Sequence, residues 1–142
     1  LVMVDIDYFK SYNDRFGHLA GDDCLRQVSQ AISGQVKRST DVVARYGGEE
    51  FGILLPATNI AGARELAERI RLAVENLHIP AAREDVSMYV TISLGVTVAK
   101  THDPQLNQTL LIARADAALY EAKHSGRNRV AFLPFLPQAQ KD

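Results

Sequence analysis

The sequence has little cysteine and no long apolar run, and each scarcity excludes a class of protein. Because Cys24 is the only cysteine, the chain cannot form an internal disulfide framework or a zinc site built from several cysteines. A single cysteine is typical of a reducing compartment, so we expect a cytoplasmic protein, either free or tethered through a preceding region. No run of about 18 apolar residues occurs, which excludes a transmembrane helix.

The sequence also lacks an excess of charge of either sign. Sixteen Lys and Arg residues stand against 17 Asp and Glu residues, for a net charge of −1. No global field therefore attracts nucleic acid or an anionic membrane, and we expect contact with neither. A polyanionic ligand would have to be held by a local site. The 142 residues, 46% of them hydrophobic, are enough for one globular domain with a core.

Hydrophobic periodicity predicts alternating strands and helices. We expect strands over 1–7, 42–46, 51–55, 87–98 and 130–133, and helices over 22–36, 60–77 and 106–120. The order is β-α-β-β-α-β followed by α-β, and its first six elements match the split βαβ pattern of ferredoxin-like folds. This predicts an α+β fold with helices packed on a sheet that contains antiparallel strands.

The chain opens directly on a predicted strand, without a turn, a cap or a signal-peptide pattern before it. We therefore expect a single domain over 1–133 that lacks its own N-terminal start. Residues 134–142 are expected to be a flexible C-terminal tail.

Asp5 is the first candidate functional residue, because it lies inside the apolar run Val2–Ile6. A lone carboxylate in a buried strand costs several kcal/mol unless it is paired or bound to a metal, so Asp5 would need a cation. The alternative is that the strand ends at Val4 and that both Asp5 and Asp7 are solvated.

A second acidic feature is the predicted hairpin tip. Gly47 and Gly48 permit the positive φ values of a tight turn, and Glu49 and Glu50 follow them without a bulky side chain to obstruct a ligand. Oxygen ligands favour Mg²⁺ or Mn²⁺ over zinc, and Mg²⁺ commonly binds together with substrate phosphates, which suggests a nucleotide substrate. The alternative is an acidic turn that only faces solvent.

A basic turn follows the last predicted helix. Lys123 and Arg127 flank Gly126 and could clamp a triphosphate. The alternative is a basic helix end that balances the helix dipole.

Several short motifs, taken together, resemble the GGDEF diguanylate cyclase family from residue 1 to about residue 133. Their order and spacing make a chance match very improbable, although each motif alone is weak. The family's opening Asp-x-Leu-Thr-type motif should lie before Leu1, and the resemblance implies a regulatory N-terminal domain in the full-length protein. The matching motifs are Asp5-Ile6-Asp7-Tyr8-Phe9-Lys10, Asn13-Asp14, Phe16-Gly17-His18, Gly21-Asp22, Arg45-Tyr46-Gly47-Gly48-Glu49-Glu50-Phe51, Ser93-Leu94-Gly95-Val96, Ala115-Asp116, Ala118-Leu119-Tyr120, Lys123 and Gly126-Arg127-Asn128.

The resemblance implies a fold similar to the polymerase palm and the condensation of two GTP molecules into cyclic di-GMP, with release of two pyrophosphates. It implies two Mg²⁺ (or Mn²⁺) ions in each active site, held by Asp5, the carbonyl of Ile6 and Glu49, with Glu50 supporting the cluster. Glu49 is also the candidate for helping to remove the 3′-hydroxyl proton. The residues expected against the substrate phosphates and the hairpin are Phe9, Lys10, Gly47, Gly48, Lys123 and Arg127.

The resemblance also assigns the guanine base. Asn13 and Asp22 match the positions that hold it, and a carboxylate accepts from guanine N1–H and N2–H₂, which adenine lacks. GTP is therefore favoured over ATP. His18 lies between these two residues and is expected either to line the pocket or to be structural.

A further match is an inhibitory site for the product. Arg38 and Asp41 form the family's RxxD pattern, with five residues between Asp41 and Gly47. Arg69 on the following helix is expected to complete this site in the dimer. The alternative is that Arg38 is a solvated cation at a helix end.

The sequence thus predicts a diguanylate cyclase catalytic domain that works as a two-fold homodimer, because each protomer presents one GTP and the reaction needs two. One alternative is a catalytically silent domain that binds cyclic di-GMP or GTP as a receptor, which the intact Asp5, Glu49 and Glu50 disfavour. Another is a purely structural dimerisation module.

Overall fold

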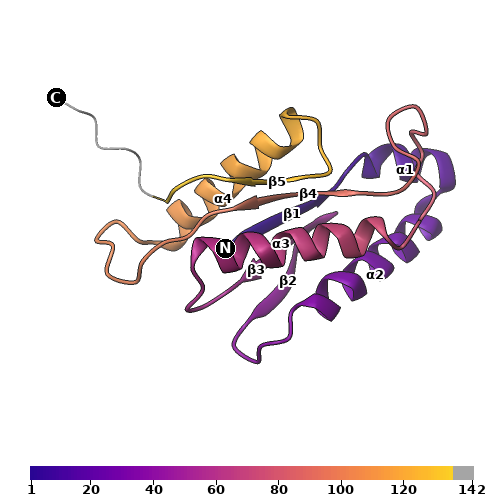
Figure 1. The fold of residues 1–142 in the computed structure, drawn as a ribbon. Coiled ribbons are helices and arrows are strands. Elements are labelled where there is room, and N and C mark those ends of the chain that lie inside the picture. Colours follow the sequence, from indigo (N-terminus) through magenta and orange to yellow (C-terminus); the bar gives the residue numbers. More distant parts are fainter. Residues whose placement is uncertain (136–142) are drawn as a thin grey trace.

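The apolar run near the N-terminus forms the central strand of a five-stranded sheet (Figure 1). The computed structural model of the chain describes residues 1–135. The predicted tail beyond them, 136–142, lies outside the described residues. The strands are β1 (Val2–Ile6), β2 (Val42–Gly47), β3 (Glu50–Leu54), β4 (Ile92–Val96) and β5 (Val130–Phe132), and the helices are α1 (Phe9–Phe16), α2 (His18–Gln35), α3 (Ile60–Glu75) and α4 (Gln108–His124).

The strand order is β2-β3-β1-β4-β5. β1 pairs antiparallel with both β3 and β4, and β2 pairs antiparallel with β3, which is the arrangement expected for the ferredoxin-like pattern. The additional α4-β5 unit places β5 parallel to β4 at the edge of the sheet. The predicted α+β fold is therefore confirmed.

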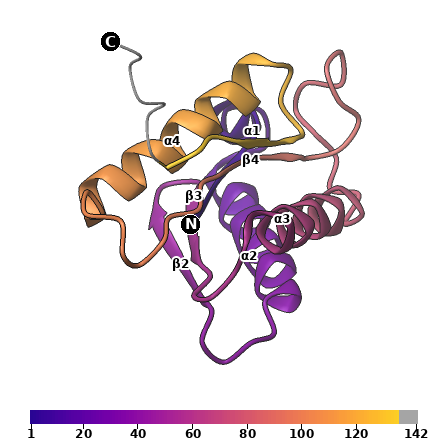
Figure 2. The same cartoon turned by 60° about the vertical axis from the view of Figure 1, so that its left-hand side comes forward.

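Helices cover both faces of the sheet. α2 and α3 pack on one face, and α4 lies on the other (Figure 2). The alternating side chains of β1 explain this division, since Val2 and Val4 enter the larger core while Met3 packs against Ala115 and Leu119 of α4. Because both faces are covered, all five residues of β1 are buried.

The segment after β1 differs from the prediction. α2 begins at His18 rather than at residue 22, and a separate helix, α1, precedes it. Gly17, with a φ of 89°, separates the two helices. α1 escaped prediction because it is short and buries only Phe9, although Phe9, Tyr12 and Phe16 follow helical spacing and pack on one another.

The long strand expected over 87–98 is also wrong in extent. β4 covers only Ile92–Val96, and Tyr89 forms an isolated bridge with Pro80. The alternation of apolar and small polar residues does not reflect one solvated face, because Ser93 and Gly95 point toward a face that is covered as well. Ser93 donates a hydrogen bond to a buried carboxylate, and Gly95 lies against the backbone of α4.

α4 forms as predicted, over 108–124 instead of 106–120, but its buried side differs from the expected stripe. Ala115, Ala118, Leu119 and Ala122 face the sheet, whereas Tyr120 is 60% exposed. Small residues are needed there because the helix approaches the sheet closely. After β5, Arg114 donates to the carbonyl of Pro134 and Phe135 is buried.

We expect Gly95→Ala to lower the free energy of unfolding by at least about 2 kcal/mol. A Cβ at Gly95 would lie 2.1 Å from the Leu119 backbone nitrogen and 2.4 Å from the Ala115 oxygen, so helix and strand would have to separate. Gly34→Ala is the matched control, because a Cβ there meets nothing within 4 Å and alanine favours the helix. Urea denaturation measures both variants, and equal stabilities would contradict the close approach.

No helix within residues 1–135 has the length and apolar character needed to cross a membrane.

Candidate functional site

Asp5 lies at the centre of the candidate site, in the buried strand β1. Its side chain is 5% exposed, and its neighbours across the sheet are Glu50 on β3 and Ser93 on β4. Asp5 follows Met3 on the α4 face of the strand, and the ammonium group of Lys123 contacts its carboxylate. The alternative of a solvated Asp5 and Asp7 is therefore wrong, since both side chains are buried.

The environment of Asp5 attracts a cation. Burial raises the pKa of Asp5 to about 6, although the hydrogen bond and charge of Lys123 act to lower it. The negative charges of Glu49 and Glu50 raise the pKa further. The negative charges of Asp5, Glu49 and Glu50 thus repel one another, and the Lys123 ammonium group does not offset the cost of burying the ionised Asp5.

The hairpin tip meets the end of β1. The Ile6 N–H donates to the Glu49 carbonyl at 3.3 Å, and Arg45 Nε donates to the Gly48 carbonyl at 2.8 Å. Gly48 adopts a φ of 51°, which favours glycine, whereas Gly47 does not share the positive φ expected of both glycines. These contacts place the two glutamates beside the buried Asp5.

The chemistry of this donor set fits Mg²⁺ or Mn²⁺. Carboxylate and main-chain oxygens are the hard ligands these ions prefer, and a cation bound here would stabilise the ionised form of Asp5, which burial disfavours. Within the described residues, no three His, Cys, Asp or Glu side chains converge into a complete metal cluster. An ion held here would therefore also take oxygens from the main chain and from a substrate phosphate.

Lys123 and Arg127 approach β1 from the end of α4 and the turn that follows it. Lys123 reaches Asp5, and the Arg127 guanidinium carbon lies 4.5 Å from the centroid of the Tyr8 ring. Tyr8 precedes the first turn of α1, whose N–H groups have no side-chain cap. In that turn Phe9 is buried and Lys10 is exposed. Cations and free N–H groups therefore gather beside the end of β1, as an anionic ligand requires.

Asn13 carries an unpaired polar atom. Its Oδ1 is buried and has no hydrogen-bond partner among the described residues, and it lies where a Cβ on Gly21 would be, at 1.7 Å. Gly21 therefore permits α1 and α2 to approach each other here. A buried acceptor without a donor is costly, so this atom suits a ligand that brings an N–H group.

Asp22 follows Gly21 on α2 and is exposed. It lines a surface hollow together with Arg45 and Phe51 of the hairpin. The structure thus brings Asn13 and Asp22 to neighbouring positions on two crossing helices. His18 is exposed at the start of α2.

Arg38 and Asp41 form an ion pair, with Arg38 Nη2 2.7 Å from Asp41 Oδ1. The same guanidinium donates to the Pro56 carbonyl at 2.7 Å and to the Thr58 hydroxyl at 2.6 Å. Arg38 therefore connects the segment before β2 with the segment after β3, and is more than a solvated helix-end cation. Arg69 is not part of this cluster, and its guanidinium lies 3.4 Å from Glu65 on its own helix.

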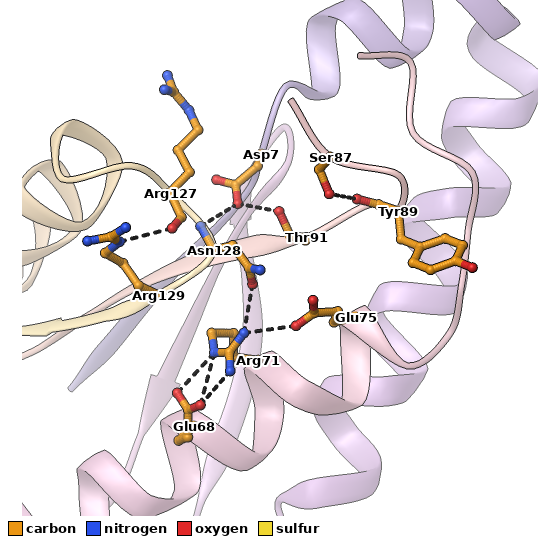
Figure 3. A network of polar contacts seen from close by, with 10 residues as sticks. All are labelled: Asp7, Glu68, Arg71, Glu75, Ser87, Tyr89, Thr91, Arg127, Asn128 and Arg129. Atoms are coloured by element: carbon orange, nitrogen blue, oxygen red, sulfur yellow. Dashed lines mark hydrogen bonds and ion pairs between the residues drawn. The ribbon is translucent and has the colours of Figure 1, made fainter. Parts of the chain in front are cut away.

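The sequence did not predict the hydrogen-bond network around Asp7, the second acidic residue near the end of β1. Thr91 donates its hydroxyl to the Asp7 carboxylate at 2.7 Å, and the Asn128 N–H donates at 3.0 Å (Figure 3). The Ser93 hydroxyl also donates to this carboxylate, at 2.7 Å. Asn128 is bound in turn by Arg71 of α3. The signal available in the sequence was the pair of hydroxyl residues at alternate positions of a strand that otherwise reads as buried.

This fold and site define a nucleotide-cyclase-like palm with an acidic hairpin, and comparison with known proteins identifies the family. Residues 1–129 match the model described as diguanylate cyclase, GGDEF domain, and the chain belongs to this family.

The relatives include diguanylate cyclase A of Treponema denticola, which is 44% identical over 92% of this chain and 34% of its own length. The response regulator PleD of Caulobacter vibrioides is 42% identical over 91% of this chain and 28% of its own length. The chain thus spans about a third or less of these two relatives.

Solved structures agree. The active GGEEF domain of a diguanylate cyclase from Vibrio cholerae matches with a TM-score of 0.78 and 33% identity, over 92% of this chain and 80% of that one. The GGDEF domain of DgcB from Caulobacter crescentus, in complex with c-di-GMP, matches with a TM-score of 0.79 and 35% identity, over 92% of this chain and 75% of that one.

Proposed function

We propose that this domain condenses two GTP molecules into cyclic di-GMP. The observation that carries the proposal is the buried Asp5 beside the Glu49-Glu50 hairpin tip, with Lys123 in contact with its carboxylate. Relatives at 42–44% identity include proteins named diguanylate cyclases, and the GGEEF domain from Vibrio cholerae is described as active with the same hairpin letters.

Different residues bind the base and the phosphates of the substrate. Asn13 accepts a hydrogen bond from guanine with its unpaired Oδ1, and Asp22 accepts from the N1–H and N2–H₂ edge. Lys123, Arg127 and the N–H groups at Phe9 and Lys10 hold the phosphates. We assign His18, which is exposed at the start of α2, to the lining of this pocket.

Asp5, the Ile6 carbonyl and Glu49 would hold two divalent cations, with Glu50 supporting them. The ions, when bound, neutralise phosphate charge and polarise the reacting oxygens. Glu49 accepts the proton of the attacking 3′-hydroxyl, because it is half-buried on a hairpin that is tied to β1. The 3′-oxygen attacks the α-phosphorus of the facing GTP, and the bond to pyrophosphate breaks. A second such step closes the ring.

The test is incubation of the domain with GTP and Mg²⁺, followed by mass identification of the product. Cyclic di-GMP together with pyrophosphate supports the proposal. Tight binding of cyclic di-GMP without turnover would instead identify a receptor. If the domain neither binds nor converts the nucleotide, a structural dimerisation role is the remaining alternative.

The reaction needs two protomers, because one domain presents one GTP. We expect the specific activity to rise with protein concentration over a hundredfold range, since the sequence contains no long heptad run to hold a dimer. Initial rates at fixed GTP measure this. A flat specific activity would contradict assembly of the active site from two weakly associated domains.

We also propose that cyclic di-GMP inhibits at Arg38 and Asp41, with Arg69 completing the site in the dimer. The DgcB domain was solved in complex with c-di-GMP. A guanidinium suits both phosphate oxygens and the N7 and O6 atoms of guanine. A ligand bound at Arg38 would lie beside the segments before β2 and after β3, and would restrain the hairpin that carries Glu49 or cross-link protomers in a non-productive orientation.

We expect Arg38→Ala to lift inhibition by added cyclic di-GMP, raising its half-inhibitory concentration roughly tenfold or more, while the initial rate with GTP changes little. Inhibition curves on the parent and the variant measure this. Arg26→Ala is the matched control, because Arg26 also forms an exposed pair three residues from its partner, Asp23. Equal affinity for cyclic di-GMP in the parent and Arg38→Ala, measured by calorimetry, would contradict the assignment.

A further inference from the structure

The turn after α4 holds Arg127 in a backbone conformation that its side chain disfavours. Gly126, Arg127 and Asn128 have φ values of 120°, 63° and 44°, and glycine and asparagine adopt positive φ readily whereas arginine does not. A residue such as Arg127 keeps this conformation only where its surroundings fix it. The turn's own support within α4 is one hydrogen bond, from the Arg127 N–H to the Ala122 carbonyl at 3.0 Å.

The Arg129 side chain adds a second hydrogen bond, from its Nε to the Arg127 carbonyl at 3.0 Å. Two other elements also support the turn, and they meet at Asn128 (Figure 3). The Asn128 N–H donates to Asp7 at the end of β1, at 3.0 Å. Its side-chain oxygen accepts from Arg71 of α3, at 2.9 Å. One residue thus connects the turn to the sheet through its main chain and to a helix through its side chain.

Both partners of Asn128 are themselves fixed. Asp7 is 7% exposed, and the hydroxyls of Thr91 and Ser93 orient its carboxylate. Arg71 is 15% exposed and lies between two acids of its own helix, Glu68 and Glu75. This surplus of partners holds the Arg71 guanidinium in one direction, toward the turn.

These contacts fix the backbone at Arg127 and so determine the direction of its side chain. Arg127 precedes Asn128, and its side chain extends away from Arg71, as Figure 3 shows. Its guanidinium lies over the ring of Tyr8, 4.5 Å from the centroid, and Tyr8 follows Asp7 directly. The same carboxylate therefore stands at the start of the segment that carries Tyr8 and against the turn that carries Arg127.

We infer that Arg71, through Asn128, is a positioning residue that aims Arg127 at the triphosphate of the substrate. Arg71 itself does not touch the substrate. The inference rests on the proposed function only in taking a guanosine triphosphate as the ligand. It assigns a role in substrate binding to α3, which carries none of the residues expected to contact GTP.

The experiment is a double-mutant cycle read by binding. Calorimetry measures the affinity for a non-hydrolysable GTP analogue, with Mg²⁺, in the parent, Arg71→Lys, Arg127→Ala and the double variant. Arg71→Lys keeps the charge but loses the planar fork that reaches Glu68, Glu75 and Asn128 together. We expect it to weaken the analogue roughly tenfold in the parent background, and less than about twofold when Arg127 is already alanine.

Two further measurements separate positioning from general loosening. GMP lacks the outer phosphates, so its affinity should be the same in the parent and Arg71→Lys. Arg64→Lys, on the same helix and exposed, should leave both affinities unchanged. Equal losses in both backgrounds of the cycle, or an equal loss for GMP, would overturn the inference.

If Arg71→Lys does not fold, Asn128→Gly replaces it in the experiment, because it removes the same Arg71–Asn128 contact. Glycine accepts the positive φ and retains the N–H that binds Asp7, so only the contact with Arg71 is lost. It should reproduce the tenfold loss for the analogue and spare GMP. If the parent makes no cyclic di-GMP but these binding relations hold, the proposed function fails and the positioning role stands.

Discussion

Asp5→Asn and Glu49→Gln should each reduce the formation of cyclic di-GMP by at least about 10²- to 10³-fold. Each substitution keeps the shape of the side chain and removes one negative charge from the group that would hold the cations. Phosphate charge would then be left without compensation as it develops. Initial rates with GTP and Mg²⁺, with the product identified by mass, measure the loss. Substantial Mg²⁺-dependent turnover by both variants would contradict the metal assignment.

A stability measurement distinguishes this loss from unfolding. Because burial raises the pKa of Asp5 from 3.8 to about 6, the folded state holds its proton more tightly than the unfolded state does. Ionised Asp5 therefore destabilises the fold, and stability falls as the pH rises from 3.8 to about 6. In buffer free of divalent cations, the parent should lose stability relative to Asp5→Asn across this window. At pH 7 the variant should unfold at the same temperature as the parent or higher.

Asn13→Ala and Asp22→Ala should weaken the preference for GTP over ATP. Each removes an acceptor for the guanine N–H groups. A hydrogen bond to the charged Asp22 contributes about 1.5–3 kcal/mol and one to the neutral Asn13 about 0.5–1.5 kcal/mol, so kcat/KM for GTP should fall roughly 10- to 100-fold in Asp22→Ala and up to about tenfold in Asn13→Ala. For ATP the value should change little, and it should rise in Asn13→Ala, because the buried acceptor that adenine leaves unpaired is gone. Competition between the two nucleotides gives the ratio directly.

Asp23→Ala is the matched control for this prediction. Asp23 is adjacent to Asp22 and equally exposed, but its carboxylate is bound by Arg26 and Gln27 on the same helix. The GTP preference should therefore be unchanged. If the preference survives in both Asn13→Ala and Asp22→Ala as well, guanine is recognised by other groups, with His18 the nearest candidate in the sequence.

The fold could be predicted wherever side-chain periodicity records burial. α3 follows its apolar stripe closely, over 60–75 against the expected 60–77, because one face meets the core and the other meets solvent. β4 was overextended, since the alternation of residues 87–98 has a cause other than one solvated face. α1 was missed because its eight residues are few and only Phe9 is buried, so its stripe of aromatic residues is short.

The candidate site was predictable where a residue is costly without a partner. Asp5 in an apolar strand is such a residue, and its burial beside a cation followed. Asp7 was not predicted as part of a network because its partners are neutral: two hydroxyls and one N–H. Hydrogen bonds of this kind depend on how the 126–128 turn is placed against the sheet, and local sequence carries no record of that placement.

The packing of α4 on β1 has a geometric consequence for Lys123. Two residues of strand advance about 6.7 Å, and four residues of helix advance about 6 Å. These two lengths are nearly equal. Met3 can therefore contact Leu119 while Asp5, two residues further along the strand, contacts Lys123, four residues further along the helix. A single inserted residue between Leu119 and Lys123 would turn the lysine about 100° around the helix axis and leave the apolar contact in place. The Asp5–Lys123 ion pair therefore fixes the length of this helix between Leu119 and Lys123, whereas the composition of that stretch is free to change.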